Sequence, residues 1–388
     1  MVIKMEYSNA IRQYRKNNCL SQKEFADMIG VKYNTICRWE TGKYQPSNKF
    51  KKELNNLIGK KECADNKEFL KSPLNYTGNK YRILNQIIPY FPKKINTFVD
   101  MFCGGATVGI NVNADVIYFI DSNEKVINLL RFLSKINFRN FVTNLEYYIN
   151  KFSLSYSNLN GYAHYFNLSK PENANNGLKM YNKEGFLKLR NEYNSLEDKT
   201  SDKANTLLYL LLVYGFNNDL RFNNKGEYNL PCGKTDLNKF NLNKVYEFNL
   251  KAQQSKFIFI CGDFRDPKIK KICYDADYLY LDPPYLLTDA VYNEMSGWNK
   301  EVEEELISFL KVCQSKHIPF CLSNVLSKND GFNEIINEPL NKFLENDSTL
   351  HMVDIDYHYR SSSYNKKNRD SKEREIIVLS EGAWHENK

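Results

Sequence analysis

The segment ADYLYLDPPYLL, residues 276–287, ends an apolar strand pattern at an aspartate, two prolines and a tyrosine. Proline has no N–H for a sheet ladder and fixes its own φ, so Pro283 and Pro284 end the strand and hold their neighbours in place. Asp282 and Tyr285 are thus presented at a rigid strand end, where open α/β sheets bind their ligands. Asp282 and the Pro283 carbonyl can accept hydrogen bonds from an amine, while Tyr285 can stack on a base. A turn without chemistry is the alternative.

A second motif lies upstream, where the strand pattern TFVDMF runs into CGGATVG. Glycines at 104 and 105 let a ligand approach the backbone closely. The next strand pattern ends at Asp121, 16 residues beyond Gly105. This position suits a carboxylate that accepts hydrogen bonds from ribose hydroxyls. The turn lacks the G-x-G-x-x-G pattern, and carboxylates at Asp100 and Asp121 would repel a phosphate. A nucleoside without phosphate, such as the cationic sulfonium S-adenosylmethionine, fits these residues better.

Strand and helix patterns alternate around these motifs. We expect strands at 96–102, 116–121, 256–262, 278–282 and 318–324, and helices at about 124–136 and 300–316. This alternation predicts an α/β fold with a mainly parallel sheet and helices on both faces. The region from about 140 to 250 is rich in Asn, Tyr and Lys and breaks the alternation. It is interpreted as an inserted second lobe.

The N-terminal segment has a helical pattern. SQKEFADMIG begins with Ser21 as an N-cap and has Glu24 three positions later, the spacing of a capping box. VKYNTICRWETGK predicts a second helix after a glycine turn, and helical stretches near 10–16 and 48–58 flank the pair. This arrangement indicates a helix-turn-helix, with a generic small helical bundle as the alternative.

The stretches LSQKEFADMIGV and ICRWETGKYQPS resemble the repressor-type (Cro/C1, XRE-like) helix-turn-helix family. The resemblance implies that Asn34, Thr35 and Arg38 lie along a recognition helix and that Gln22, at the start of the preceding helix, contacts DNA. Residues 1–72 hold 15 Lys or Arg against 8 Asp or Glu, so they carry a surplus of seven out of the net charge of +8. Positive charge clustered in this way suits a phosphate backbone, although lysine-rich surfaces are often only solvated.

Five segments together resemble a Dam-type DNA adenine-N6 methyltransferase of the α group, in the order of that family: PLNYTGNK, FVDMFCGGATVG, FIDSN, GDF and DPPY. The resemblance implies a Rossmann-like S-adenosylmethionine-dependent methyltransferase sheet. By position, the catalytic residues would be Asp282, Pro283, Pro284 and Tyr285. The residues that contact the cofactor would be Tyr76, Lys80, Phe102, Gly104, Gly105, Asp121, Asp263, Phe264 and Asp282. The family often has tryptophan where Tyr76 stands, which keeps an aromatic face.

The segment GFNNDLRFNNKGEYNLPCGK, residues 215–234, has the pattern of a β-hairpin with NNKG at its turn. It resembles the target-reading hairpin of Dam-type enzymes. On that resemblance Arg221 is expected to contact a guanine, because its fork matches O6 and N7 in the major groove. Asn217, Asn223 and Pro231 are further candidates for DNA contact. A phosphate contact by Arg221 is the alternative, and the target sequence stays open between GATC, GATATC and others.

These patterns predict a helix-turn-helix domain at 1–60, a linker at 61–72 and a methyltransferase domain at 73–388 with its insert at about 140–250. The expected function is site-specific methylation of adenine N6 in double-stranded DNA, in a restriction-modification system or a phage, with autoregulatory DNA binding. A cognate restriction endonuclease is expected as a genetic rather than a physical partner. One alternative is a repressor that senses S-adenosylmethionine. Another is an RNA or protein-glutamine methyltransferase, which usually lacks the hairpin lobe.

Composition restricts the class of protein further. The hydrophobic fraction is 42%, and no apolar run approaches the ~20 residues of a membrane span. The polar start has no signal-peptide core, so we expect a cytoplasmic protein without a membrane partner. The nine cysteines are scattered and include no C-x-x-C pair. They are interpreted as reduced thiols rather than metal ligands, and no metal is expected.

Overall fold

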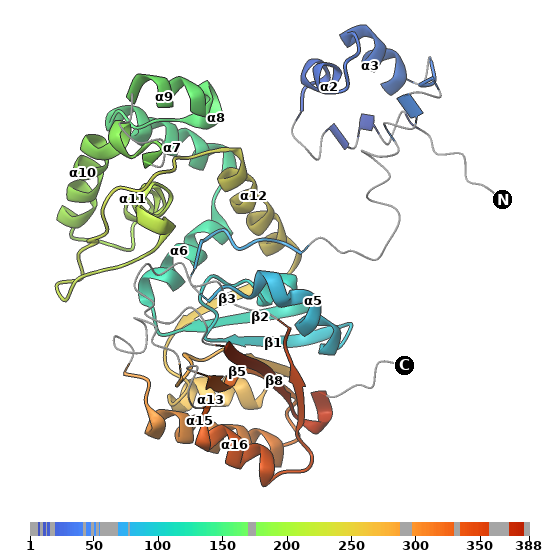
Figure 1. Ribbon diagram of the computed structural model, residues 1–388, viewed down its shortest axis with the longest axis vertical. Coiled ribbons are helices and arrows are strands. Elements are labelled where there is room, and N and C mark those ends of the chain that lie inside the picture. Colours follow the sequence, from blue (N-terminus) through green and yellow to red (C-terminus); the bar gives the residue numbers. More distant parts are fainter. Residues whose placement is uncertain are drawn as a thin grey trace. The chain divides into compact units, whose positions relative to one another are not determined.

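The structure is a computed structural model, shown in Figure 1. It forms two compact units, Met1–Glu68 and Phe69–Lys388, which are described separately. The boundary between the units falls within the segment interpreted as a linker. The structure describes residues 7, 11–12, 14–15, 20–41, 44–47, 50–51, 54, 69–76, 78–169, 176–287, 297–329, 334–356 and 372–383.

The first unit contains two short helices, α2 (Gln22–Met28) and α3 (Tyr33–Glu40), joined by a turn with Gly30 at φ 67°. Ser21 and Glu24 form the expected capping box at the start of α2. Phe25, Ile36 and Trp39 belong to the core of this unit. The flanking helices expected at 10–16 and 48–58, and residues 61–68 of the expected linker, lie wholly or partly outside the described residues.

The second unit is built on an eight-stranded sheet with the strand order β3-β2-β1-β4-β5-β8-β7, in which β6 pairs with β5. β3, β2, β1, β4 and β5 are parallel, whereas β8 is antiparallel to both of its neighbours. Strand bounds are β1 (Ile95–Met101), β2 (Ala114–Asp121), β3 (Lys256–Cys261), β4 (Tyr278–Leu281), β5 (Phe320–Asn329), β6 (Glu334–Ile336), β7 (His351–Asp354) and β8 (Lys372–Leu379). The five expected strands are all present, and β6, β7 and β8 are additional.

Helices cover both faces of the sheet, as expected (Figure 1). One face packs against α5 (Leu84–Ile87), α6 (Glu124–Lys135) and α12 (Lys239–Gln254). The other packs against α13 (Pro267–Tyr274), α15 (Lys300–Ser315) and α16 (Glu338–Glu345). Short 3-10 segments are η2 (Lys80–Ile83), η3 (Ile88–Tyr90), η4 (Gly109–Asn111), η6 (Phe216–Asn218) and η7 (Glu381–Ala383).

The inserted lobe lies between α6 and β3 and is helical. It contains α7 (Phe138–Lys151), α8 (Ser157–Asn160), α9 (Tyr162–Ser169), α10 (Lys179–Ser195) and α11 (Asp202–Tyr214), and α12 returns the chain to the sheet. Residues 204–214 of α11 are all buried, which fits its apolar sequence.

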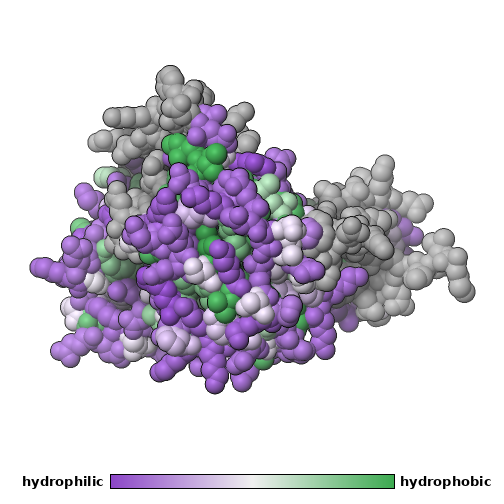
Figure 2. All heavy atoms as spheres, turned by 90° about the horizontal axis from the view of Figure 1, so that it is seen from below, coloured by the Kyte–Doolittle hydropathy of each residue, from purple (hydrophilic) through white to green (hydrophobic). Residues whose placement is uncertain are grey.

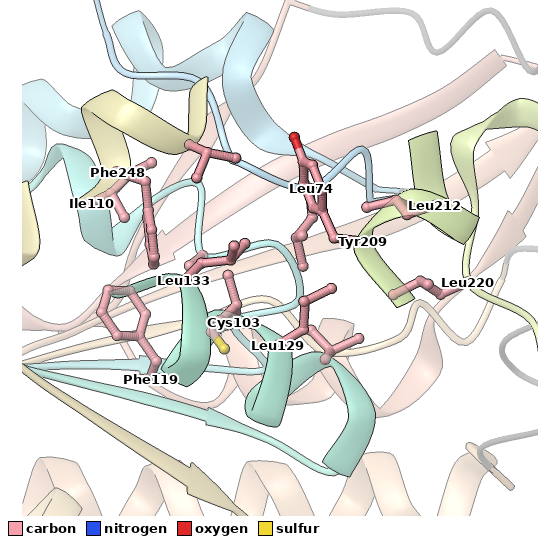
Figure 3. Packing of buried hydrophobic residues seen from close by; sticks show 14 of the residues in the cluster. Leu74, Cys103, Ile110, Phe119, Leu129, Leu133, Tyr209, Leu212, Leu220 and Phe248 are labelled. Carbon is pink, nitrogen blue, oxygen red and sulfur yellow. The ribbon is translucent and has the colours of Figure 1, made fainter. Parts of the chain in front are cut away.

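The lobe and the sheet share one hydrophobic core. Figure 3 shows Leu129 and Leu133 of α6 near Tyr209 and Leu212 of α11, with Leu220 of the following segment beside them. Each Å² of apolar surface that such a core removes from water stabilises the folded state by roughly 25 cal/mol. The lobe is therefore held against the sheet by a continuous core.

The face of the molecule seen in Figure 2 is largely polar. Figure 2 shows one end of the molecule, where hydrophilic residues predominate and apolar residues form small separate groups. Among the described residues, no helix combines the length and apolar character that a membrane crossing requires. The seven described cysteines are free.

Candidate active site

Four strand ends bring the sequence motifs together. In the parallel register Met101 is opposite both Ile120 and Leu281, and Asp121 is opposite Cys261. The residues that follow β3, β2, β1 and β4 therefore lie side by side at the carboxyl edge of the sheet. The chain order reverses between β1 and β4, and such a switch point opens a crevice for ligands.

Asp282 follows β4 directly and is paired with a buried lysine. Nζ of Lys80 lies 2.9 Å from Oδ1 of Asp282, and the lysine is 4% exposed. The Asn79 side chain accepts from the Tyr81 N–H and begins the 3-10 segment that carries Lys80. The same ammonium lies 4.9 Å from the centre of the Tyr285 ring. The structure thus joins the first and the last of the five motifs through a charge contact.

The hydroxyl of Tyr285 lies between two carboxylates. It is 3.1 Å from Oδ1 of Asp282 and 3.2 Å from Oε1 of Glu375, so its single proton can be donated to either. Glu375 comes from β8 and is 3% exposed, and Nζ of Lys80 lies 3.8 Å from its Oε1. Within the described residues, its Oε2 is buried and has no hydrogen-bond partner.

Sequence reasoning missed Glu375 because β8 was not predicted. The sequence does contain a signal, since a glutamate directly before the apolar run IIVL stands where a strand would bury it. A carboxylate at such a position needs a partner, and carboxylates are almost never fully buried without one. Lys80 and Tyr285 are its partners here.

Burial raises the pKa of three carboxyl groups at this edge of the sheet. Burial, together with the charges of Asp282 and Asp121, raises the pKa of Asp100 to about 8, although its Oδ2 accepts the Gly109 N–H at 2.8 Å. Burial also raises the pKa of Asp121 and of Asp282, against the charge and hydrogen bond of Lys80 at Asp282. Asp100 is therefore mainly protonated at neutral pH, and the repulsion of phosphate expected from it is lost.

The glycine turn is shaped by close contacts rather than by an open cradle. A Cβ at Gly104 would lie 2.7 Å from Cδ1 of Tyr76, and one at Gly105 would lie 2.7 Å from Oγ of Ser72. Gly104 has φ 47°, and its N–H donates to Oδ2 of Asp121 at 2.8 Å. Asp121 also accepts the Asn123 N–H at 2.8 Å. Tyr76, the glycine turn and Asp121 are thus one connected unit.

An aromatic cluster lies beyond the first strand. Phe102, with φ 61°, has its ring centre 5.8 Å from that of Phe264 and 5.6 Å from that of Trp298. Phe264 is buried in the core, so its ring supports Phe102.

Asp263, the neighbour of Phe264 in the chain, forms a two-pronged ion pair with Arg265, with both N–O distances at 2.8 Å. Trp298 was not predicted as a site residue.

The predicted target-reading segment folds back on itself without regular strands. Two isolated antiparallel bridges, Gly215 with Cys232 and Phe222 with Tyr228, hold its arms together. Gly226 has φ 76°, and its N–H donates to the Asn223 carbonyl at 2.8 Å, so NNKG forms the expected turn. The first arm is interrupted by the 3-10 segment η6, where Asn217 and Asn218 have φ 57° and 53°, and the Asn218 amide donates to the Val213 carbonyl at 2.7 Å.

The candidate DNA-contacting side chains of this segment differ in their exposure. Arg221, Asn217 and Pro231 are exposed, and Nε of Arg221 donates to Oδ1 of Asn229 at 3.0 Å. Asn223 is occupied within the turn, where its Oδ1 accepts from the Glu227 N–H at 3.0 Å. Asn229 therefore orients the guanidinium of Arg221, whereas Asn223 serves the turn.

In the first unit, the expected recognition helix is α3. Asn34 and Arg38 are exposed, Thr35 is half-buried, and the Arg38 guanidinium lies 5.4 Å from the centre of the Tyr44 ring. The Gln22 amide is used inside the unit, where it donates to Oε2 of Glu40 at 2.7 Å and accepts from Sγ of Cys37 at 3.4 Å. Gln22 is accordingly left out of the DNA-contacting set proposed below.

Glu40 anchors this arrangement. Burial alone would raise its pKa, but hydrogen bonds from Arg15 and Gln22 and the charges of Arg15 and Arg12 lower it. Nε of Arg15 lies 2.7 Å from Oε1 of Glu40.

Among the described residues of the whole chain, no cluster of three or more His, Cys, Asp or Glu side chains is arranged to hold a metal ion.

Comparisons with known proteins agree with this geometry. Residues 76–352 match the D12 class N6 adenine-specific DNA methyltransferase family, and residues 11–61 match a helix-turn-helix family. The chain is 35% identical over 312 residues to the type II methyltransferase M.FokI of Planomicrobium okeanokoites, covering 79% of this chain and 42% of the relative.

Two further relatives are modification methylase StsI of Streptococcus sanguinis and a DNA adenine methylase of Escherichia coli. The first is 30% identical over 368 residues, covering 93% of this chain and 49% of the relative. The second is 27% identical over 263 residues, covering 67% of this chain and 81% of the relative. The chain spans about half the length of the first two relatives. With the family match spanning most of the sheet, the inserted lobe and DPPY, the chain belongs to the D12 class of N6 adenine-specific DNA methyltransferases.

Proposed function

We propose that this chain transfers a methyl group from S-adenosylmethionine to N6 of adenine at a specific site in double-stranded DNA. The observation that carries the proposal is the position of Asp282 at the end of β4, where it forms an ion pair with Lys80 and accepts a hydrogen bond from the Tyr285 hydroxyl. The family match and the names of the relatives, two of which are called methyltransferase or modification methylase, support the same activity.

Adenine N6 is a poor nucleophile because its lone pair is delocalised into the ring. An acceptor that bonds the amine N–H draws the nitrogen towards tetrahedral geometry and frees that lone pair. Asp282 and the Pro283 carbonyl are the proposed acceptors, and the two prolines hold them in position before the base arrives. Tyr285 is proposed to stack on the extruded adenine, with its ring direction set by the hydroxyl contacts.

The residues at the carboxyl edge fit S-adenosylmethionine. Asp121 and Asp282 place two carboxyl groups at this edge, whose negative charge in the ionised form suits a sulfonium, and Asp121 is placed to accept from ribose hydroxyls. Tyr76 and the glycine turn would hold the body of the cofactor, and Phe102 would pack against its adenine with Phe264 behind it. The bound cofactor would supply an electrophilic methyl group.

Expression in a bacterial host without adenine methylases tests this function. Sequencing that detects modified bases should find N6-methyladenine at one recurring sequence in host DNA, and none in cells that express Asp282→Ala. The substitution removes an acceptor, and loss of one well-placed catalytic partner typically costs about 100- to 1000-fold. Methylated cytosine, or equal adenine methylation in both strains, would overturn the proposal.

Arg221 is proposed to read a guanine of the target. It is exposed and held by Asn229, so its two terminal nitrogens can reach O6 and N7 of one base. Arg221→Ala should relax discrimination at one base pair by roughly 1 to 3 kcal/mol. Methylation rates on duplexes with single base-pair changes separate this result from a uniform loss, which would indicate a phosphate contact instead.

A second DNA-binding activity is proposed for the helix-turn-helix, through Asn34, Thr35 and Arg38 of α3. Its proposed use is repression at an operator near the gene itself or near an associated endonuclease gene. In footprinting with the full chain, Asn34→Ala/Arg38→Ala should lose the operator footprint and keep target methylation. Arg221→Ala should keep the operator footprint and relax discrimination at the methylation target. Loss of both activities in either variant would contradict separate roles.

A further inference from the structure

Lys244 of α12 is a buried lysine that pairs with no carboxylate among the described residues. It is 4% exposed, and its Nζ donates to Oδ1 of Asn75 at 2.8 Å. It takes part in no ion pair with a described carboxylate. Burying an ammonium without a counter-ion costs free energy, and burial together with the nearby charge of Lys71 lowers the pKa of Lys244 to about 8.

A second lysine shares the same aromatic ring. Nζ of Lys71 lies 4.8 Å from the ring centre of Phe240, and Nζ of Lys244 lies 5.4 Å from it. Phe240 is 53% exposed, so the ring has a face open to solvent beside two cations. The ring attracts each cation, but it does not neutralise the repulsion between the two ammonium groups, and no described carboxylate forms an ion pair with either lysine.

The position of this cluster connects it to the active site. The segment with Lys71 and Asn75 continues into Tyr76 and Lys80, and α12 leads from the inserted lobe to β3. Figure 1 shows α12 running between the lobe and the sheet, and the Lys244 contact fixes Asn75 against it. A polyanion that reaches both the lobe and Asp282 would pass near such a junction.

We propose that Lys71, Lys244 and Phe240 bind a phosphodiester group of the DNA substrate, with the Lys71 ammonium on the phosphate, the charge of the buried Lys244 ammonium behind it and the ring against the deoxyribose. This inference rests on the proposed function. Contacts of this type fix the orientation of a protein on the duplex and carry no sequence information. The phosphate supplies a counter-charge for Lys244, which pairs with no carboxylate in the described part of the chain, and Asn75 holds the Lys244 side chain at the site.

The test measures methyl transfer to unmethylated plasmid DNA by the full chain at several NaCl concentrations. Each phosphate contact contributes about 0.9 to the slope of log affinity against log salt, so Lys71→Gln/Lys244→Met should lower the slope of log kcat/KM by about 0.9. The kcat at saturating DNA should stay within about twofold, because the site positions DNA and takes no part in chemistry. The helix-turn-helix is identical in every variant, so its contribution cancels.

Lys311→Gln is the matched control, because Lys311 of α15 also lies near an aromatic ring, 6.0 Å from the centre of Phe343. It should leave the salt slope unchanged. Lys71→Gln alone tests the site if loss of the buried lysine prevents folding, and it should lower the slope and raise KM. An active wild-type protein with the same slope in all variants would overturn this inference alone. A wild-type protein that methylates no adenine would overturn the proposed function, and this inference with it.

Discussion

Nζ of Lys80 lies 2.9 Å from Oδ1 of Asp282, although 202 residues separate them in the chain. Lys80 is carried by a 3-10 segment before the first strand, and Asp282 follows the fourth. Burial raises the pKa of Asp282, and the charge and hydrogen bond of Lys80 oppose that rise and favour the charged form of the acceptor. This contact is the basis of the first prediction.

Lys80→Met should shift the acidic limb of the rate profile to higher pH. Lys80 lowers the pKa of Asp282, so its removal raises that pKa and leaves less of the acceptor ionised at neutral pH. Loss of a hydrogen bond to a charged group costs roughly 1.5 to 3 kcal/mol, about 10- to 150-fold in rate at pH 7. Single-turnover rates from pH 5.5 to 9 measure the shift, and an unchanged profile would show that Lys80 serves another purpose.

Glu375 is predicted to act through Tyr285 as a positioning residue. Glu375→Gln keeps an oxygen acceptor for the Tyr285 hydroxyl and should retain most of the activity. Glu375→Leu removes the acceptor and should lose roughly tenfold or more. In a double-mutant cycle with Tyr285→Phe, the double variant should lose little more than the larger single loss, because both changes break one contact. Fully additive losses would contradict a shared role.

The close approach of Tyr76 to the glycine turn predicts a steric requirement at Gly104. Gly104→Ala places a Cβ 2.7 Å from the tyrosine ring and should weaken cofactor binding at least tenfold in calorimetry. Gly161→Ala is the matched control, since Gly161 has φ 79° and no atom within 4 Å of its added Cβ. Both variants carry a backbone cost because each glycine has a positive φ that alanine rarely adopts, and Gly161, with ψ 149°, lies outside the left-handed helical region. Equal cofactor affinity in the two variants would contradict the account.

Asp100 predicts a pH dependence of stability. Its pKa is about 8 in the fold against an ordinary value of 3.8, so the folded state holds the proton more tightly than the unfolded chain. The resulting stability is fully present below pH 4 and is lost as the pH rises towards 8. Because one pKa unit corresponds to about 1.4 kcal/mol, the loss is on the order of several kcal/mol.

Asp100→Asn removes this titration and keeps an oxygen that can accept the Gly109 N–H. Between pH 5 and pH 8, the variant should lose less thermal stability than the wild-type protein when unfolding of residues 69–388 is followed. Parallel curves of melting temperature against pH would show that Asp100 is ionised in the fold.

The residues at the carboxyl edge were predictable because each follows a local pattern. DPPY ends a strand by proline chemistry, and Asp121 ends an apolar run, so neither needs knowledge of distant partners. Glu375 was not predictable in this way. Its burial depends on β8 inserting antiparallel beside β5, a pairing decided by the rest of the sheet.

Tertiary contacts also decided how some side chains are used. Gln22 occupies a helix start that suits DNA contact, but the buried Glu40 on the next helix takes its amide. Asn223 lies in the expected turn, but its side chain stabilises that turn. The predicted hairpin lacks regular strands because a 3-10 segment with Asn217 and Asn218 at positive φ interrupts its first arm, and the Asn218 amide donates to the Val213 carbonyl of α11. Competition of this kind for hydrogen bonds cannot be read from spacing alone.

The central claim is methyl transfer to adenine N6 at Asp282. Its most direct test incubates the purified full chain with double-stranded plasmid DNA and S-adenosylmethionine that carries a deuterated methyl group, followed by mass spectrometry of the digested nucleosides. The account predicts labelled N6-methyldeoxyadenosine with the wild-type protein and none with Asp282→Ala. Label in methylcytidine, no label in the DNA nucleosides, or equal labelled adenosine in both reactions would contradict it.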